Sequence, residues 1–407
     1  MTSAVSMSRR VAWVVWVIAS IFYAYQYLLR VMPNVLLTDI MRQFDIGAAT
    51  FGQFSGVYYI GYSLIHLPLG IMLDRFGPKK VMTLCILTSV IGLTPLLFAH
   101  HWIYPIIGRF LIGIGSSGAI LGVFKIIRMT FAEKQFPRML SFSVMIGLIG
   151  AIYGGGPVSY MREVLGYQAV VQLFALGGVA LALATYWLVP GVATTTSESS
   201  VLSDIKEVLG NKKVVLFCLL SGLMVGPLEG FADVWGTVFL KTVCGVDAPL
   251  AASMPSLIFI GMCFGAPVLS FIAEKIGNYL LAIACAGAIM ALCFLSLLLG
   301  HFPAMAISVS FIIVGVCSAY QILAVYKASM YVREQVAGLA TAMANMIIMV
   351  FGYAFHTIMG SVIHAKGGPT EKLALLAGMS VIPIALLLAV GGFIGFIMQE
   401  RKVQTSC

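Results

Sequence analysis

Long runs of apolar residues dominate this chain and are separated by short polar segments. A helix needs about 20 apolar residues to cross the hydrocarbon core of a bilayer. Runs of this length lie at about residues 11–38, 50–73, 81–99, 103–125, 139–161, 168–190, 213–240, 250–273, 278–299, 303–326, 336–358 and 373–397. The pattern therefore predicts an all-α membrane protein with twelve transmembrane helices.

One long polar segment interrupts this pattern, at residues 191–212 (GVATTTSESSVLSDIKEVLGNK). It is rich in Ser and Thr, and six apolar runs lie on each side of it. We therefore expect residues 1–190 to form an N-terminal six-helix bundle and residues 213–407 a C-terminal six-helix bundle. The polar segment between them is predicted to be a cytoplasmic linker.

The composition excludes a soluble globule, a disordered chain and a disulfide scaffold. Hydrophobic residues make up 60% of the chain and charged residues only 10%, whereas soluble domains carry about 25% charged residues. Mean hydropathy is +1.02. The net charge of +9 comes from basic residues scattered through the short gaps between apolar runs, which indicates contact with the lipid bilayer and not with nucleic acid.

The distribution of Lys and Arg predicts the orientation. If the N-terminus is cytoplasmic, the inner segments hold 17 of these residues and the outer loops hold 5. Because cytoplasmic loops of membrane proteins carry the excess of positive charge, we expect both termini to be cytoplasmic. A multi-pass protein of a bacterial inner membrane is the predicted location.

Cysteine and histidine patterns give no sign of a metal, a cofactor or catalysis. The eight Cys form no CxxC pair and mostly lie in apolar runs, as small buried side chains do. The six His lack metal-ligand spacing at membrane depth, and only His66 and His356 are plausible cavity residues. No nucleophile–base pair is recognisable, so we expect no enzyme activity, no metal site and no cofactor.

The second half of the chain weakly repeats the first at an offset of about 200 residues. LDRFG at residues 73–77 corresponds to AEKIG at 273–277, and FKIIRMTFAEKQ at 124–135 corresponds to YKASMYVREQ at 326–335. Two matches in the same order indicate duplication. Two pseudo-symmetric six-helix bundles are typical of transporters whose solute site lies where the halves meet.

The loop GIMLDRFGPKK at residues 70–80 resembles the signature loop of the major facilitator superfamily, and GRFLIGIG at 108–115 is similar to that family's second motif. The resemblance implies a functional monomer, and it implies that this loop latches the inner side of the protein, with Asp74, Arg75, Lys79 and the degenerate counterpart Glu274 as gating residues. The alternative is that the loop only sets the topology. The resemblance links Arg109 to proton coupling, although it could instead bond loop carbonyls.

Function should depend on ionisable residues at membrane depth, since they are costly there. Arg30, Arg109, Glu229 and Asp233 are predicted to share one layer of the membrane. Glu229 and Asp233 are four residues apart and so share a helix face, next to a Gly-Pro pair at 226–227 that weakens the helix. When the two halves of the sequence are aligned, Arg30 falls close to the position of Asp233, so we expect the two side chains to approach each other across the cavity. A purely structural ion pair, or a Glu229 solvated near the rim, remains an alternative.

Polar side chains are expected to surround the same layer. The candidates are Tyr27, Tyr59, Tyr62, Tyr320, Gln321 and Asn345. Tyrosines also populate membrane interfaces, so part of this set could be anchors. A cavity with tyrosines, an arginine and two carboxylates suits a zwitterion, because the arginine would take a carboxylate and an acidic side chain an ammonium group.

Glycines and two lysines have plainer interpretations. Small-xxx-small pairs at residues 52 and 56 and at 261 and 265 predict close helix contacts. The run from Gly150 to Pro157 predicts a bend and partly resembles a glycine-proline motif of the family's antiporters. Lys125 and Lys327 are the matched pair at the inner ends of their spans, and snorkelling at the interface is the simpler reading.

The segment FYAYQYLLRVMP at residues 22–33 resembles one bacterial branch of the superfamily, which includes amino-acid transporters of vacuole-dwelling bacteria and is similar to lysosomal dipeptide carriers. The predicted function is secondary active transport of an amino acid or short peptide by rocker-switch alternating access. Symport with protons, carried by Glu229 or Asp233, is a hypothesis. Transport of organic anions, siderophores or drugs is the alternative, and a non-transporting membrane sensor is a more distant one.

Overall fold

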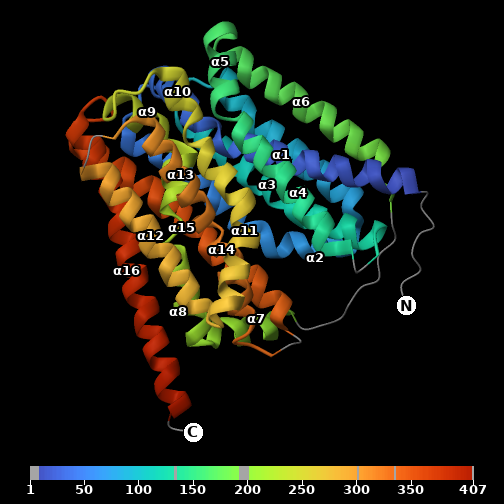
Figure 1. Cartoon of the computed structure of the whole chain (residues 1–407). Helices are drawn as coiled ribbons and strands as arrows, with labels where there is room; N and C mark the ends of the chain where they lie inside the picture. Colours follow the sequence, from blue (N-terminus) through green and yellow to red (C-terminus); the bar gives the residue numbers. More distant parts are fainter. Residues whose placement is uncertain (1–8, 133–134, 192–200, 300–301, 334–335, 406–407) are drawn as a thin grey trace. The chain divides into compact units, whose positions relative to one another are not determined.

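The computed structural model describes residues 9–132, 135–191, 201–299, 302–333 and 336–405 (Figure 1). Part of the predicted linker, residues 192–200, lies outside this range, as do the ends of the two repeated loops at 133–134 and 334–335. Every regular element in the described chain is helical, which confirms the predicted class. The helices are α1 (Arg9–Phe44), α2 (Ala48–Phe98), α3 (Ile103–Thr130), α4 (Phe136–Tyr153), α5 (Gly156–Leu165), α6 (Tyr167–Leu188), α7 (Val201–Gly210), α8 (Lys212–Gly222), η2 (Gly226–Trp235), α9 (Gly236–Thr242), α10 (Ala248–Ser253), α11 (Ser256–Ile276), α12 (Tyr279–Leu299), α13 (Ala304–Ser318), α14 (Tyr320–Ser329), α15 (Ala337–Ala365) and α16 (Lys372–Thr405).

Each of the predicted apolar segments falls in one of these helices or in a consecutive set of them. Among the described residues, 10 helices are long and apolar enough to cross a membrane, or 11 if the bent pair formed by α4 and α5 counts as one span. The long helix α2 holds two predicted segments, which are separated at Gly77 by a non-helical conformation with φ 78°. A side chain rarely adopts that angle, so glycine suits the turn. The chain is therefore an integral, multi-pass membrane protein.

The helices group into two compact units, which we call unit 1 and unit 2. Unit 1 comprises residues 1–46 and 57–198, and unit 2 comprises residues 47–56 and 199–407. In unit 1, α1 packs against α3, α4 and α6. In unit 2, α11 packs against α13, and α12 lies along α16 (Figure 1). The beginning of α2 thus belongs to unit 2 and most of its length to unit 1.

The predicted glycine contacts are present. A methyl group at Gly52 or Gly56 would collide with α15 at His356, and one at Gly261 or Gly265 would collide with the backbone of α13. The glycine run between α4 and α5 produces a bend of 40°. Glycine therefore provides close backbone approach here, as expected for helices that pack in a membrane without a hydrophobic driving force between them.

Polar contacts tie the linker helix α7, which is part of unit 2, to the rest of that unit. Glu207 on α7 accepts hydrogen bonds from the Arg333 guanidinium, including one of 2.8 Å from Nε to Oε1. This bond lowers the pKa of the Glu207 carboxyl. Asn211 caps α8 by accepting from the backbone N–H of residues 213 and 214, and it donates to the Tyr331 carbonyl at 2.8 Å.

Tyr331 is the centre of this contact region. Its hydroxyl donates to Glu400 Oε1 on α16 at 2.7 Å, and its ring lies against Phe217 and Phe396. Burial, and then the neighbouring Glu400 carboxylate, raise the pKa of Tyr331. The hydroxyl therefore stays protonated, and one side chain joins α8, α16 and the segment that follows α14.

Candidate functional site

The buried charges of unit 1 lie where α1 passes through a proline. Pro33 has no N–H, so the carbonyl of Leu29 loses its usual partner four residues later. Arg109, on α3 and 1% exposed, donates from Nη1 to that carbonyl at 2.5 Å and from Nη2 to the Arg30 carbonyl at 2.7 Å. Its guanidinium also lies over the Tyr58 ring at 4.8 Å. Arg109 thus stabilises the interrupted turn of α1.

The sequence suggested two roles for Arg109, proton coupling or hydrogen bonding to loop carbonyls, and this geometry bears on the second. The arginine does bond backbone carbonyls, but they belong to the interior of α1 and not to a loop, so the expectation of loop carbonyls was wrong. The reason is that a proline inside a helix frees carbonyls at membrane depth, where no water can bond them. The link to proton coupling stays a prediction.

Arg30 is held between aromatic rings. Its guanidinium carbon lies 5.2 Å from the centre of the Tyr27 ring and 5.4 Å from that of Tyr59. All three side chains are buried, with Arg30 only 6% exposed. Cation–π contacts of this kind contribute about 0.5–2 kcal/mol each. The structure therefore brings together three of the predicted binding residues, with both rings close to the Arg30 guanidinium.

Tyr62 belongs to a row of stacked rings on α2. Tyr58, Tyr62 and His66 follow one another at four-residue spacing, with ring centres 6.1 Å and 5.2 Å apart. The row ends in polar contacts: Tyr58 donates to Gln26 Oε1 at 2.8 Å, and His66 Nδ1 lies 2.9 Å from the hydroxyl of Ser117. Gln26 and Ser117 were not predicted as site residues, because the candidates were chosen around the ionisable residues and the tyrosines.

The two carboxylates of unit 2 lie on a π-helix. The segment between α8 and η2 makes tight turns, with Val225 N–H bonded to the Gly222 carbonyl at 3.3 Å, and the chain then continues as η2 from Gly226. The helix thus breaks at residues 223–225, directly before the Gly-Pro pair that was predicted to weaken it. Glu229 and Asp233 are both 0% exposed, so the alternative of a solvated Glu229 is wrong. Short π-helical turns occur often at functional sites.

Helix α15 supports this π-helix through a stripe of glycines. Gly222, Gly226 and Gly230 follow one another at four-residue spacing and face Phe351, Phe355 and Met359 of α15, which have the same spacing. A methyl group at Gly226 would lie 2.7 Å from the Phe355 ring, and one at Gly230 2.9 Å from the Met359 sulfur. This stripe was not among the predicted glycine contacts, although its small-xxx-small spacing can be seen in the sequence.

The remaining predicted residues of unit 2 have different positions. Tyr320 is fully buried, and its hydroxyl donates to the Ser221 carbonyl at 2.7 Å, which ties α14 to α8. Gln321 follows it, and its Nε2 is buried without a hydrogen-bond partner among the described residues. Trp235 Nε1 is in the same state. Asn345 is half-buried on α15. Buried donors normally find a partner. The side-chain N–H groups of Gln321 and Trp235 can therefore donate to a bound solute or water.

His356 on α15 contacts the π-helix directly. Its Nε2 lies within hydrogen-bonding distance of the Glu229 carbonyl, and the side chain is 0% exposed. The sequence indicated His356 only as a plausible cavity residue. Its role as a partner of the π-helix could not be predicted, because the contact joins residues 127 positions apart.

The signature loop makes local contacts in unit 1. Asp74 accepts a hydrogen bond from Lys125 Nζ at 2.7 Å, although the Asp74 side chain is 71% exposed. Arg75 lies over the Phe76 ring and Lys79 over the Tyr186 ring. A latch role for these residues stays a prediction.

The matched region of unit 2 is paired differently. Lys327 Nζ lies 3.8 Å from Glu400 Oε1 and 4.9 Å from the Tyr331 ring centre, while Glu274, the counterpart of Asp74, is exposed. Both matched lysines are thus in ion pairs. The sequence predicted only that they would snorkel at the interface.

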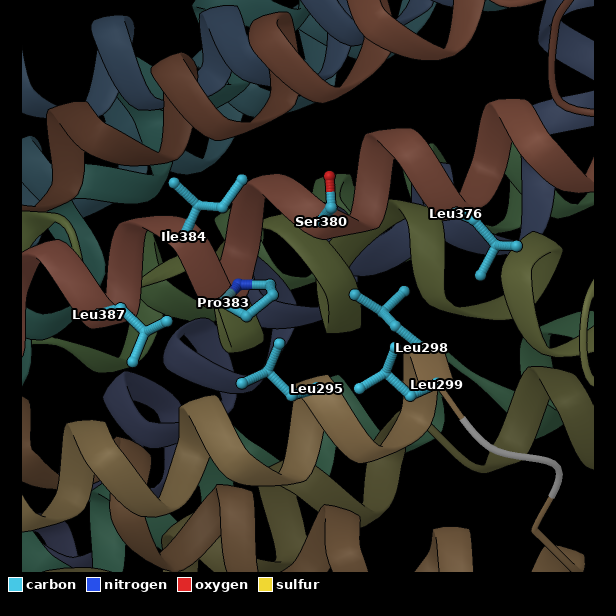
Figure 2. A pocket seen from close by; sticks show the side chains of 8 residues that line it. All are labelled: Leu295, Leu298, Leu299, Leu376, Ser380, Pro383, Ile384 and Leu387. Carbon is cyan, nitrogen blue, oxygen red and sulfur yellow. The ribbon is translucent and has the colours of Figure 1, made fainter.

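The structure offers an apolar cavity of about 310 Å³ at another place, between α12 and α16 (Figure 2). Its lining residues are Leu295, Leu298, Leu299, Leu376, Ser380, Pro383, Ile384 and Leu387. Leu299 and Leu387 are largely exposed, as lipid-facing side chains of a membrane helix are. The cavity contains none of the predicted site residues. No group of three or more His, Cys, Asp or Glu that could hold a metal occurs in the part of the chain that the structure describes.

Comparison with known proteins agrees with this architecture. Residues 16–357 match the family model of the Major Facilitator Superfamily. Over 381 residues, the chain is 22% identical to the nitrite extrusion protein of Bacillus subtilis, which covers 89% of this chain and 90% of that protein. Shorter matches include the putative metabolite transport protein NicT of Pseudomonas putida, 24% identical over 176 residues, and a quinolone resistance transporter of Acinetobacter baumannii, 26% identical over 176 residues. Each shorter match spans 41% of this chain and 40% of the relative.

Solved structures have the same fold. The nucleoside transporter NupG superposes with a TM-score of 0.73 at 16% identity, covering 94% of this chain and 98% of its own. A bacterial homologue of the human lysosomal transporter Spinster, in an inward-facing unoccupied conformation, superposes with a TM-score of 0.73 at 17% identity, covering 95% and 97%. At these identities the likeness establishes the fold and leaves the solute open.

Proposed function

This chain belongs to the Major Facilitator Superfamily, and we propose that it is a proton-coupled secondary transporter of an amino acid or short peptide in a bacterial inner membrane. The observation that carries the proposal is the division of buried charge between the two units. Unit 1 buries Arg30 between tyrosine rings, and unit 2 buries Glu229 and Asp233 on a π-helix. Buried charges in membrane helices are expensive and are retained for function.

The chemistry of these groups favours a zwitterionic solute. A guanidinium presents a planar fork that matches a carboxylate, and the Tyr27 and Tyr59 rings lie close to the Arg30 guanidinium. A carboxylate on η2 would take the ammonium group of the same solute. The spare donors of Gln321 and Trp235 could bond a peptide carbonyl. Arg30, Glu229 and Asp233 are thus the residues proposed to recognise the solute.

Transport would follow from alternating access, with the N-terminal bundle, residues 1–190, and the C-terminal bundle, residues 213–407, rocking about the linker, and with both termini in the cytoplasm. The signature-loop residues Asp74, Arg75 and Lys79 would gate the inner side, and Glu274 would act in the second half. A monomer would suffice, because one chain contains both bundles. A carboxylate that is protonated in one state and ionised in another would link solute flux to the proton gradient.

The substrate is tested with purified protein in proteoliposomes and a panel of radiolabelled amino acids and dipeptides. We expect saturable accumulation of at least one member by the wild type. Arg30→Lys keeps the charge but loses the fork, so it should raise KM about tenfold, and Arg30→Gln should abolish uptake. Arg42→Gln is the matched control, because Arg42 is an exposed arginine on the same helix. Lack of uptake for the whole panel by the wild type would refute the substrate class.

Proton coupling is tested by imposing a pH gradient on the same vesicles. The wild type should accumulate solute more strongly with the gradient, and Glu229→Gln or Asp233→Asn should remove that dependence while leaving solute exchange. Asp247→Asn serves as control, because Asp247 is an exposed carboxylate in the same unit. Unchanged gradient dependence in both buried-site variants would exclude these carboxylates from coupling.

Export of an apolar drug is a second candidate, favoured by the match to a quinolone resistance transporter and by the apolar cavity between α12 and α16 (Figure 2). The same vesicles separate the two functions. Extrusion of lipophilic cations, unaffected by Arg30→Gln, would support the exporter.

A further inference from the structure

The π-helix η2 needs support from outside its own sequence. Hydrogen bonds from residue i to i+5 widen the turn, and π-helices usually last for a single turn. This segment runs from Gly226 to Trp235, and the Gly236 N–H still bonds the Phe231 carbonyl five residues earlier. The glycines at 226 and 230 also weaken helix formation. A wide turn of this length should persist only where neighbouring helices hold it.

Helix α15 provides that support, and His356 makes its polar contact. A carbonyl oxygen can only accept a hydrogen bond, so the His356 Nε2 next to the Glu229 carbonyl must carry the proton and donate it. The contact falls on the backbone of the residue whose side chain is one of the two buried carboxylates. On either side of it, Phe355 and Met359 fill the space above Gly226 and Gly230.

The backbone that carries His356 is closely packed. The backbone carbonyl of His356 lies where a side chain on Gly52 would be, and the His356 Cβ would be 3.1 Å from a methyl group on Gly56. These two glycines lie in the part of α2 that belongs to unit 2. Close packing therefore holds the α15 backbone and the His356 Cβ at this residue, from which the imidazole reaches η2.

We propose that His356 is a positioning residue for the carboxylate pair: its Nε2–H bond to the Glu229 carbonyl keeps residues 226–235 in the π conformation and thereby sets how Asp233 is rotated relative to Glu229 about the helix axis. A return to α-helical hydrogen bonding would shift the register of the segment and turn Asp233 relative to Glu229. His356 itself touches neither the solute nor the proton in this proposal. Its consequence for transport rests on the proposed function, whereas its consequence for η2 does not.

The first test measures the π-helix directly, by hydrogen–deuterium exchange and mass spectrometry on the purified protein in detergent. His356→Leu removes the donor, so peptides that cover residues 226–235 should exchange about tenfold faster, as loss of one net hydrogen bond predicts. His356→Gln places an amide N–H near the position of Nε2 and should stay within about twofold of the wild type. His66→Leu is the matched control, because His66 is also buried and hydrogen-bonded but lies in unit 1.

The second test measures KM and maximal rate for a radiolabelled amino-acid mixture in proteoliposomes. His356→Leu should raise KM by about fivefold or more with a smaller change in maximal rate, and His356→Gln should restore KM. If the Leu variant fails to fold, His356→Asn replaces it, because the shorter side chain cannot reach the Glu229 carbonyl and should behave as the Leu variant does.

Equal exchange of residues 226–235 in the wild type and the variant that lacks the donor would overturn the proposal. So would equal behaviour of the Gln and Asn variants, since only one of them can replace the bond. If the mixture is not transported at all while the exchange results hold, the proposed function fails and the role of His356 in the π-helix stands.

Discussion

Each unit has a buried side chain that contacts carbonyls of a helix near a proline, but the two arrangements differ. In unit 1, α1 remains an α-helix through Pro33, and Arg109 donates hydrogen bonds to the carbonyls of Leu29 and Arg30. In unit 2, the chain breaks before Pro227, continues as a π-helix, and His356 contacts the Glu229 carbonyl. The weak repeat of the sequence aligns these two regions.

The difference follows from what the neighbouring helix offers. Arg109 carries five donors in a rigid fork and can satisfy two carbonyls together, so α1 keeps its geometry despite the missing N–H. His356 offers a single donor, and the glycines of unit 2 allow α15 to approach closely. Pro33 thus lies inside α1, where an arginine bonds the carbonyl that it frees, whereas Pro227 lies in the first turn of η2, where a missing N–H breaks no helical bond.

The largest effect is expected when the hydrogen bonds from Arg109 to α1 are removed. Arg109→Leu leaves two carbonyls of α1 without their charged donor, so we expect a loss of about 2–4 kcal/mol in the free energy of unfolding, measured by denaturation in mixed detergent micelles. Pro33→Ala restores an N–H to the helix. In that background, the cost of Arg109→Leu should fall by about 1 kcal/mol.

Arg128→Leu is the control for this double-mutant comparison, because Arg128 is an exposed arginine on the same helix as Arg109. It should change stability by less than about 0.5 kcal/mol. Strict additivity of Pro33→Ala and Arg109→Leu would contradict the idea that the arginine compensates for the proline.

An intermediate effect is expected in the packing of unit 2. Gly226→Ala forces a methyl group against the Phe355 ring, which should cost about 1–3 kcal/mol of stability. Phe355→Leu in the same chain removes the obstacle and should recover part of the loss. Gly391→Ala, an exposed position on α16 with open space, should be neutral or slightly stabilising. Thermal unfolding of the three variants compares them, and a harmless Gly226→Ala would show that α15 does not pack tightly on η2.

The smallest effect separates the two matched lysines. Lys125→Met removes a pair in which Asp74 is 71% exposed, so a change of about 0–0.5 kcal/mol is expected. Lys327→Met removes contacts with the Glu400 carboxylate and with the Tyr331 ring. Because the Glu400 side chain is only 34% exposed, this variant should lose about 0.5–1 kcal/mol of stability. Stability curves in low salt measure the difference, and a larger cost at Lys125 would reverse the order derived from exposure.

The linear pattern of the chain was enough to predict its class, its helical segments and several local events. Runs of about 20 apolar residues indicate spans because a bilayer allows few other structures. The break directly before the Gly-Pro pair, the bend after Gly150 and the close contacts at Gly52 and Gly261 depend on local backbone chemistry, and the structure confirms them. The family was also predictable, because its signature loop is short and specific.

Partners across the fold were decided only by tertiary structure. The sequence names Arg109 and His356 but not the carbonyls they contact, since those contacts join residues 79–80 and 127 positions apart. From sequence, Glu229 could lie at the rim or in the interior, and the tertiary structure buries its side chain completely. The sequence also could not foresee a π-helix, because the segment between Gly226 and Trp235 only permits one. A wide turn is stable where a neighbouring helix fills the glycine spaces and bonds a carbonyl, and no single segment contains that information.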